Sequence, residues 1–334
     1  MPCYSPLKGY KDRHTGGLTF RRSDALERMD VACGQCLGCR LDYSLMWAIR
    51  IAHEASMHAD DCGNSFITLT YRDKRDCNLE QCENGWHIPD DWSLHPSHFT
   101  LFMKRLRKKF PQKIRYFVAG EYGRNCKHGI NVEEVGCPVC YVGRPHFHAC
   151  LFNCSFSDLE SYASDDGVLR YTSKLLSETW RYGFVDVSEL NFASAAYVAR
   201  YVLKKVNGDK ADWHYLSYDM EGQLTYLHPE FCRMSRGGRA GKGKRCGIGA
   251  TWLEKYWRDV YPSDEVPVVG EGVLMKVPRY YDEMFGERFP QVLEEVKNVR
   301  KVFKMQHPDL FDPDRLIDAY KVKKAFLANK KRRL

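Results

Sequence analysis

The chain has 334 residues, long enough for one large or two ordinary domains, and its 44% hydrophobic and 13% aromatic residues are typical of a packed protein rather than a disordered one. No apolar run approaches the roughly 20 residues that span a bilayer, and the N-terminus lacks the apolar core of a signal peptide, so we expect a cytoplasmic protein. The net charge of +8 is concentrated in segments 101–110, 233–245 and the terminal KKRRL, as in proteins that contact phosphate groups. For 101–110 a solvated helix face is the alternative.

The N-terminal segment lacks clear periodicity and leads into a dense cysteine run, CGQCLGCR. Fourteen cysteines in a chain without an export signal favour metal ligation over disulfides. Cys33, Cys36 and Cys39 have C-x2-C-x2-C spacing, and Cys3 is the candidate fourth ligand of a tetrahedral zinc site. Free buried thiols are the alternative, and iron–sulfur ligation is disfavoured because nothing in the sequence indicates redox chemistry.

Helical and strand patterns alternate after these cysteines. Apolar residues at helical spacing predict a helix at 43–58 and an amphipathic helix that begins after Ser97 as its N-cap. Runs of β-branched and aromatic residues predict strands. The expected strands are 65–71, 113–123, 145–153 and 183–190, and the later expected helices are 173–181 and 192–206.

This order of elements predicts an α+β fold in which helices flank an antiparallel sheet. Strands 113–123 and 145–153 are expected to be antiparallel neighbours joined by an elaborated loop. We expect three segments: a cysteine-rich part with a helix packing on the core at 1–60, the core at 61–207 with a cysteine-rich insertion at 124–143, and a basic Gly/Arg loop with an α-rich extension at 208–334.

The insertion carries a second candidate zinc site. Cys137 and Cys140 form another C-x2-C pair, and Cys126 lies upstream with His128 as a further possible ligand. The spacing suits a zinc-stabilised hairpin loop, again with free buried thiols as the alternative. Such zinc would be structural and would stiffen the loop that precedes His146.

Two histidines in the strand 145–153 form an H-x-H pair. Alternate side chains of a strand share a face, so His146 and His148 can both bind one divalent ion. Taken alone, such a pair is more typical of structural histidines, but Glu121 ends the preceding strand and can supply a third ligand. Two imidazoles and one carboxylate leave coordination positions open, as in catalytic sites, and either Mg²⁺ or Mn²⁺ is compatible.

The helix 192–206 carries two tyrosines four residues apart. Tyr197 and Tyr201 therefore share one face, which Lys204 and Lys205 continue. Helical tyrosines usually belong to the core, but a separate apolar ridge can fill that role here. Beside lysines and a metal, a tyrosine hydroxyl, whose ordinary pKa is about 10, can attack a phosphate. The ridge consists of Ala195, Val198, Ala199, Val202 and Val206.

The segment 233–245 alternates glycine with basic residues in a loop-forming sequence that can wrap a polyanion. Its candidate DNA-binding residues are Arg233, Arg236, Arg239, Lys242, Lys244 and Arg245.

These motifs resemble those of a known enzyme family. RPHFHACLF and YVARYVLKK are similar to the two signature motifs of HUH endonucleases, the rolling-circle replication initiators, and FITLTY resembles the strand motif that precedes them. CGQCLGCR, WAIRIAHEA, LFMKRLRK, GEYG and MSRGGR with the later GIG resemble the replication initiators of microviruses, particularly the gokushovirus group.

The resemblance implies a ferredoxin-like or RRM-like core and a nickase that cuts single-stranded phage origin DNA, forms a 5′-phosphotyrosine link and religates unit-length circles. It implies His146 and His148 as metal ligands, Glu121 as the third, and Tyr197 and Tyr201 as nucleophiles. Host helicase and polymerase are implied partners in the bacterial cytoplasm. A zinc-stabilised DNA-binding regulator without catalysis and a relaxase or transposase of the same superfamily are the alternatives.

Overall fold

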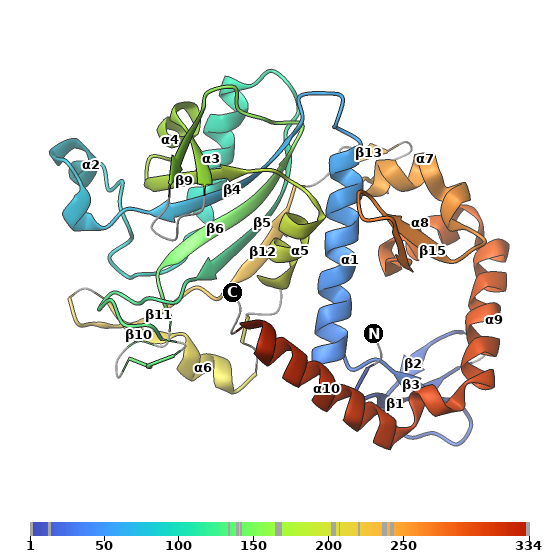
Figure 1. Ribbon diagram of the computed structural model, residues 1–334. Coiled ribbons are helices and arrows are strands. Elements are labelled where there is room, and N and C mark those ends of the chain that lie inside the picture. The colour runs from blue at the N-terminus through green and yellow to red at the C-terminus, as the bar shows by residue number, and fades with distance from the viewer. Residues whose placement is uncertain are drawn as a thin grey trace. The chain divides into compact units, whose positions relative to one another are not determined.

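A computed structural model gives the fold of the chain (Figure 1). The chain divides into two compact units, one formed by Met1–Met46 with Asp282–Leu334 and the other by Trp47–Tyr281. The structure describes residues 3–12, 15–132, 134–137, 140, 142–163, 169–201, 205–206, 208–219, 221–235, 239–240 and 244–331.

The larger unit is built on an antiparallel sheet whose seven described strands have the order β12-β5-β6-β4-β9-β8-β7. Every pair of neighbours is antiparallel, which confirms the expected mixed α/β architecture. The four sequence-predicted strands correspond to β4, β5, β6 and β9. The bounds are β4 Asn64–Tyr71, β5 Arg115–Tyr122, β6 Pro145–Phe152, β7 Leu159–Ala163, β8 Leu169–Ser173, β9 Gly183–Ser188 and β12 Phe231–Met234.

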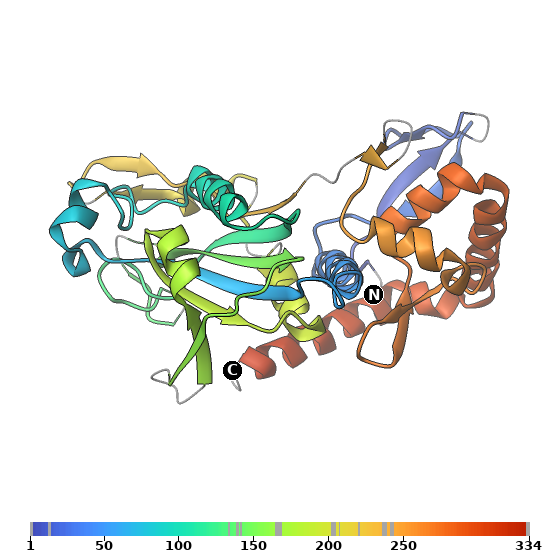
Figure 2. The ribbon, with the colours of Figure 1, turned by 90° about the horizontal axis from the view of Figure 1, so that it is seen from above.

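Helices cover both faces of this sheet because alternate strand residues point to opposite sides (Figure 2). On one face, Phe102 of α3 and Trp180 of α4 pack with Leu69 and Phe147 in the larger core cluster. On the other, α1 and α5 pack against Phe66 and its neighbours on β5 and β6. The helix bounds are α1 Leu37–Ser56, α2 Leu79–Glu83, α3 Pro96–Lys109, α4 Lys174–Trp180 and α5 Phe192–Arg200, with the 3-10 turn η1 at Lys74–Asp76.

Two helices start earlier than expected. α1 already begins at Leu37 within the cysteine run, where the Arg40 N–H donates to the Cys36 carbonyl at 3.0 Å. α3 begins at Pro96, so the expectation that Ser97 is its N-cap is wrong. Proline is favoured in the first helical turn because its missing N–H has no partner to lose there.

Helix α5 is shorter than predicted. It ends at Arg200, and Tyr201 is its C-cap residue rather than a mid-helix position. Lys205 lies beyond the helix and is exposed, while Val202 and Lys204 lie outside the described residues. The predicted continuation of one helical face through Lys205 is therefore wrong.

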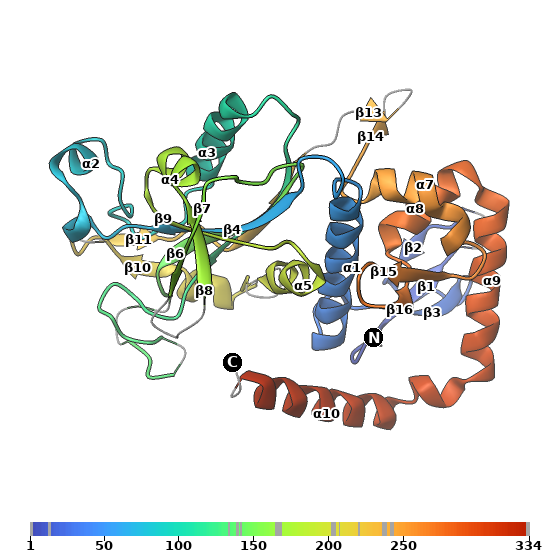
Figure 3. The same ribbon diagram turned by 45° about the horizontal axis from the view of Figure 1, so that its top comes forward.

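Strands β7 and β8 form a hairpin that extends the sheet at its edge (Figure 3). Every residue of β7 is exposed, so this segment lacks the alternation of buried and exposed positions by which a strand is usually predicted. Pairing of Tyr171 with Val187 joins the hairpin to β9.

The chain returns to the sheet after 208, because β12 pairs with β5. Residues 208–281 therefore belong to the same compact unit as the core, a division that differs from the expected segment boundary at 207. The remaining elements of this unit are α6 Lys210–His214, β10 Leu216–Tyr218, β11 Leu224–Tyr226, β13 Arg239–Ala240, β14 Lys244–Arg245, α7 Ala250–Val260, β15 Glu265–Val268 and β16 Val273–Lys276.

The smaller unit combines a three-stranded sheet of the order β2-β1-β3 with C-terminal helices. Arg300 of α9 bonds both carboxylate oxygens of Asp282 at 2.7 and 3.0 Å. None of the described helices combines the length and apolar character needed to cross a membrane. The bounds are β1 Leu7–Lys11, β2 Leu18–Thr19, β3 Glu27–Val31, α8 Arg279–Arg288, α9 Pro290–Gln306 and α10 Pro313–Lys331, with the 3-10 turn η3 at Pro308–Phe311.

Candidate active site

The register between β5 and β6 brings a carboxylate and two imidazoles together. Glu121 is paired directly with His146, and His148 lies two residues further along β6 on the same face. The sequence expectation that the two strands are antiparallel neighbours is confirmed. A shift of one residue in this register would have moved Glu121 to the opposite face of the sheet.

The three side chains converge on one point. The Glu121 Oε1 atom lies 2.7 Å from His146 Nε2 and 3.0 Å from His148 Nε2, and the two Nε2 atoms are 3.1 Å apart. Glu121 and His148 are buried, whereas His146 is partly exposed. Burying a carboxylate is costly unless positive charge or hydrogen bonds compensate it. These side chains therefore have the composition and spacing of a metal-ligand set.

Neighbouring groups orient both imidazoles. The Nδ1 atom of His146 lies 3.1 Å from the Arg144 carbonyl, which can only accept, so Nδ1 donates there and Nε2 is the nitrogen that faces the site. His148 Nδ1 lies 3.0 Å from Thr68 Oγ1. Such partners are typical of metal-bound histidines. The residues fit a divalent ion, and two imidazoles suit Mn²⁺ better than Mg²⁺.

The sequence interpretation did not include Thr68 or the Arg144 carbonyl. Thr68 could have been found from the alternation in FITLTY, since the strand β4 pairs with β6 and Thr68 is directly opposite His148. The contact between the Arg144 carbonyl and His146 does not depend on the Arg144 side chain, so it could not be predicted from the sequence.

Both tyrosines of α5 lie beside the metal-ligand set. The Tyr201 ring stacks on the His148 ring with a centroid distance of 5.0 Å and an interplanar angle of 5°. The Tyr197 ring meets the same imidazole edge-on at 5.3 Å. Tyr197 is 39% exposed and Tyr201 only 8%. The pair is thus brought to the site with unequal access to solvent.

Burial raises the pKa of Tyr201 far above its usual range, and the negative charge of Glu121 acts in the same direction. The Tyr201 hydroxyl also interacts with Tyr197 and Glu121. This phenol is therefore uncharged at neutral pH, and its O–H donates a hydrogen bond to the carboxylate.

Capping and packing hold α5 in place. Asn191 and Ser194 form a reciprocal capping box at its start, with side chain to backbone distances of 3.0 and 2.9 Å. Ala195, Val198 and Ala199 are fully buried in the cluster that includes α1 and the sheet. The predicted apolar ridge thus packs on the core over these three residues, while the Tyr197 ring packs edge-on against Phe66 and His148 and stays partly exposed.

The predicted basic residues are only partly described. Lys204, Arg236 and Lys242 lie outside the described residues, and for Arg239, Lys244 and Arg245 only the backbone in β13 and β14 is described. Arg233 is paired with Val118 on β5, so its side chain lies on the face opposite Glu121. Arg233 is therefore not brought to the metal-ligand set.

Comparison with known proteins identifies the family. Residues 64–206, from β4 to just beyond α5, match the family model of the replication-associated protein ORF2/G2P. The chain is 33% identical over 301 residues to the replication-associated protein ORF2 of Spiroplasma virus 4, covering 84% of this chain and 79% of that protein. The chain belongs to the replication-associated proteins of microviruses.

Further relatives support this assignment. The replication-associated protein VP4 of Bdellovibrio phage phiMH2K is 29% identical over 304 residues, which cover 87% of this chain and 79% of that protein. The replication-associated protein ORF4 of Chlamydia phage 1 is 31% identical over 182 residues, 52% of this chain and 38% of that protein. No solved structure matches the chain. The recognition of a microvirus replication initiator from the sequence is thus confirmed.

The smaller unit of this microvirus protein holds four cysteines together. Cys3, Cys33, Cys36 and Cys39 have ligand atoms within 4.8 Å of one another. The backbone N–H of Tyr4 donates to Cys36 Sγ at 3.3 Å, and the N–H of Cys36 donates to Cys33 Sγ at 3.2 Å. Amide donors of this kind stabilise thiolates, the form that binds metal. Cys3 thus lies where a fourth zinc ligand was expected.

A second group lies in the loop between β5 and β6. Cys126, His128, Cys137 and Cys140 also have ligand atoms within 4.8 Å of one another, and the three cysteines are buried. His128 Nδ1 lies 3.4 Å from Cys140 Sγ and 3.5 Å from Cys137 Sγ. The structure therefore includes His128 in this group of four.

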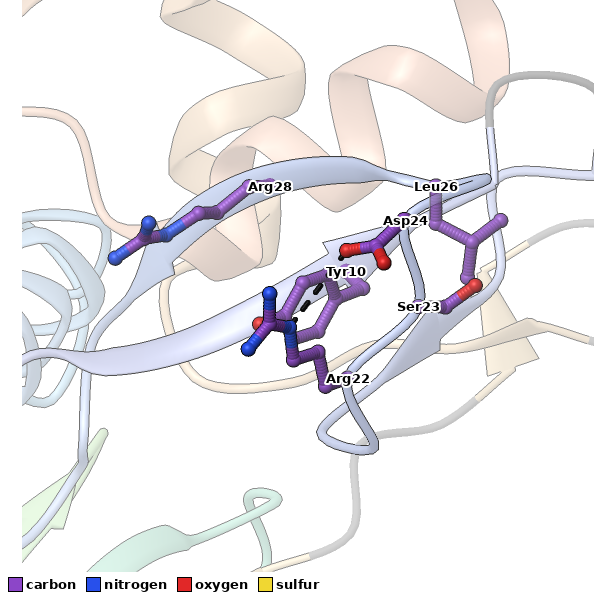
Figure 4. A pocket seen from close by; sticks show the side chains of 6 residues that line it. All are labelled: Tyr10, Arg22, Ser23, Asp24, Leu26 and Arg28. Carbon is purple, nitrogen blue, oxygen red and sulfur yellow. Dashed lines mark ion pairs between the residues drawn. The ribbon is translucent and has the colours of Figure 1, made fainter.

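A hollow on the small sheet is separate from these groups (Figure 4). Its Arg22 and Asp24 form an ion pair at 3.6 Å, and both side chains are more than four-fifths exposed. Arg28 extends away from this pair. An exposed pair of this kind contributes little to binding or stability. The metal-ligand set is therefore the better candidate for the functional site. The lining residues are Tyr10, Arg22, Ser23, Asp24, Leu26 and Arg28.

Proposed function

We propose that this protein is an HUH endonuclease that nicks single-stranded DNA at a phage origin and becomes covalently linked to the 5′ end. One observation carries this proposal. The His148 imidazole belongs to the metal-ligand set with Glu121 and His146, and it also contacts the rings of Tyr197 and Tyr201. Tyrosine-dependent strand transfer requires a nucleophilic phenol and a metal site beside it, and these groups lie together here.

Tyr197 is the proposed first nucleophile because it is the more exposed of the two phenols. Glu121, His146 and His148 would hold a divalent ion, which when bound would supply Lewis-acid polarisation of the scissile phosphate. The Tyr197 oxygen forms a bond to phosphorus, and the bond between phosphorus and the 3′ oxygen breaks. The phenol gives up its proton to solvent, and the departing 3′ oxygen takes up a proton from solvent to become a hydroxyl. The phosphotyrosine retains the bond energy that later religation needs.

Tyr201 is proposed as the second nucleophile. While Tyr197 holds a 5′ end, Tyr201 can attack the regenerated origin and release a unit-length circle. Its burial against His148 and its interaction with Glu121 support a role close to the metal-ligand set. Tyr201 has to lose its contact with Glu121 before it attacks, which would delay its reaction until the first step is complete.

The relatives favour phage replication over conjugation or transposition. They carry the name replication-associated protein and come from small phages, so we propose rolling-circle replication rather than a relaxase or transposase activity. Of the host partners that the resemblance implies, the polymerase would extend the free 3′ hydroxyl and the helicase would unwind the duplex ahead of it. The core itself is proposed to be of the RRM-like type.

We further propose structural zinc at both cysteine groups. Each group offers four soft or borderline ligands whose atoms lie within 4.8 Å of one another, and four protein ligands complete a tetrahedral zinc site without an open position for substrate. Zinc supports the folding of two poorly periodic segments, the N-terminal strands and the β5–β6 loop. A DNA-binding regulator without catalysis would need the same zinc, but it would not need the tyrosines beside the metal-ligand set.

The test of nicking is a covalent adduct assay. The protein is incubated with labelled single-stranded origin DNA and Mn²⁺, and a slower band is sought on a denaturing gel. We expect Tyr197→Phe to remove most of the first-turnover adduct and the double variant with Tyr201→Phe to remove all of it. Tyr171→Phe, an exposed tyrosine on the opposite face of the sheet, is the matched control and should leave the adduct unchanged.

Two results would overturn the proposal. The absence of a wild-type band would reject nicking and favour the regulator. A band that persists in the double tyrosine variant would reject the nucleophile assignment.

A further inference from the structure

The sheet face that carries the metal-ligand set continues onto β9. Directly paired residues share a face, and the pairing runs from Glu121 to His146, from His146 to Thr70 and from Thr70 to Phe184. Phe184 therefore points to the same side as His146, two strands away. With neighbouring strands about 4.8 Å apart, the separation is about 10 Å, close to the span of one to two nucleotides.

Phe184 is uncovered although β9 is an interior strand between β4 and β8. Its side chain is 54% exposed, whereas its neighbours Val185 and Val187 are buried on the opposite face. The α1 and α5 cluster covers this face over β4, β5 and β6 but includes no residue of β9. A large aromatic ring is thus presented to solvent beside the proposed active site.

Arg72 adds a positive charge next to this ring. It follows Thr70 by two residues on β4 and its immediate extension, and its guanidinium lies 5.8 Å from the Phe184 ring. The Nη1 atom is buried and has no hydrogen-bond partner among the described residues. The adjacent carboxylate of Asp73 is engaged instead with Arg75 and Arg144. Arg72 as a whole is only partly buried, so a turn of its side chain would present this unsatisfied donor to a ligand oxygen.

Acidic residues limit how far this surface extends. Asp186 lies two residues beyond Phe184 on the same face and accepts a hydrogen bond from the Tyr162 hydroxyl. Glu160 is exposed on β7 further along the sheet. Negative charge there repels phosphates, so the surface around Phe184 and Arg72 suits a single nucleotide rather than a long track.

We propose that Phe184 and Arg72 form a binding site for one unpaired nucleotide of the substrate strand, next to the scissile phosphate. The base stacks on the Phe184 ring, and Arg72 donates hydrogen bonds to the phosphate. An aromatic ring on an open sheet face can stack with an unpaired base but not with a base inside a duplex. This inference rests on the proposed nicking function and adds a means of holding the strand in register for attack.

The test measures DNA binding without cleavage. In a background carrying Tyr197→Phe and Tyr201→Phe with Mn²⁺ present, Kd is measured for single-stranded origin DNA that carries 2-aminopurine at successive positions. We expect Phe184→Ala to raise Kd about tenfold or more, and to abolish the fluorescence change at one position. Arg72→Gln should lower the slope of log Kd against log salt by about 0.7, the value for one phosphate contact on a single strand.

Tyr171→Ala is the matched control. Tyr171 is also an exposed aromatic residue, on the neighbouring strand β8, but it pairs with Val187 and so faces the opposite side. If Phe184→Ala binds DNA as Tyr171→Ala does, and its thermal unfolding matches wild type, the nucleotide site is rejected. The nucleotide site is also rejected if Phe184→Ala weakens DNA binding but the 2-aminopurine fluorescence change is retained at every labelled position.

The adduct assay on the wild-type protein separates the two proposals. No wild-type adduct means that the nicking proposal has failed. A normal wild-type adduct combined with unchanged binding by Phe184→Ala means that nicking stands and the nucleotide site is wrong. If an apolar peptide binds the wild-type protein but not Phe184→Ala, while DNA binds both equally, this face belongs to a protein partner and the inference is overturned.

Discussion

Glu121 links the metal-ligand set to the tyrosines. Its Oε1 atom contacts both imidazoles, and its charge acts on the Tyr201 hydroxyl. His146 and His148 are oriented from outside by a carbonyl and a hydroxyl, whereas Glu121 supplies the only carboxylate oxygen among the described residues of this set. The affinity for a hard divalent ion should therefore depend most strongly on this residue.

We predict that Glu121→Gln weakens Mn²⁺ binding by at least about tenfold. Mutation of a residue that only hydrogen-bonds to a metal ligand already lowers metal affinity by about tenfold or more, and Glu121 is itself a proposed ligand. The amide keeps the size of the side chain but loses its charge. The measurement is isothermal titration of the purified protein with Mn²⁺. Glu230→Gln is the control, because Glu230 is equally buried but bonds Tyr215 instead. Equal Mn²⁺ affinity in the two variants would contradict the ligand assignment.

The loop between β5 and β6 connects the second cysteine group to the metal-ligand set. At its base the Gly123 N–H donates to the Arg144 carbonyl at 2.8 Å, and the Arg144 N–H donates to the Asn125 carbonyl at 2.7 Å. The Arg144 carbonyl also accepts from His146. Zinc bound in this loop, as proposed above, would therefore fix the backbone group that orients one of the imidazoles.

We predict that Cys140→Ser lowers the zinc content by about one ion per chain, because a tetrahedral site rarely survives the loss of one thiolate. Adduct formation should fall as well, with a higher Mn²⁺ concentration needed for half-maximal rate. Metal content is measured by inductively coupled plasma mass spectrometry. Cys62→Ser, an exposed cysteine outside both groups, should leave both quantities at wild-type values. Unchanged zinc in the Cys140 variant would refute the loop site.

The larger unit is held together by buried polar residues of α1 as well as by its apolar core. Glu54 pairs with Arg115 of β5 and accepts from the Gly249 N–H at 2.8 Å. His53 stacks on Trp252 of α7, with 3.5 Å between ring centroids. These contacts connect α1 to the sheet and to the segment that follows the basic hairpin β13–β14.

Two neutral histidines should make this unit sensitive to acid. Burial lowers the pKa of His53 to about 4, and burial likewise lowers that of His98 to about 4. An unfolded histidine has a pKa near 6.5, so the unfolded chain binds protons first as the pH falls. The free energy of unfolding therefore keeps its full value above pH 6.5 and falls between about pH 6.5 and 4, by up to about 3 kcal/mol for His53.

The measurement is urea unfolding as a function of pH. We expect His53→Gln to flatten the loss of unfolding free energy between pH 6.5 and 4, even if the variant is less stable at every pH. The exposed His307 provides the comparison, and His307→Gln should retain the wild-type slope. Identical slopes for the His53 variant and wild type would contradict the assignment.

Much of the architecture follows from local patterns. Alternation in β6 determined that His146 and His148 share a face, and the four-residue spacing determined that Tyr197 and Tyr201 do. The main strands and helices were predictable for the same reason, since backbone geometry repeats every two residues in a strand and every 3.6 in a helix. The β7–β8 hairpin was not predictable, because all of β7 and the first three residues of β8 are exposed and show no alternation of buried and exposed positions.

The sequence by itself thus determined which residues belong to each motif, and the family to which they point. Only the tertiary structure decided that Glu121 is in register with His146, that Cys3 reaches Cys33, and that β12 returns to β5. It alone decided that Tyr201 is buried while Phe184 stays open. The physical reason is that spacing along a strand or helix is set by local backbone geometry, whereas register and burial depend on elements distant in the chain.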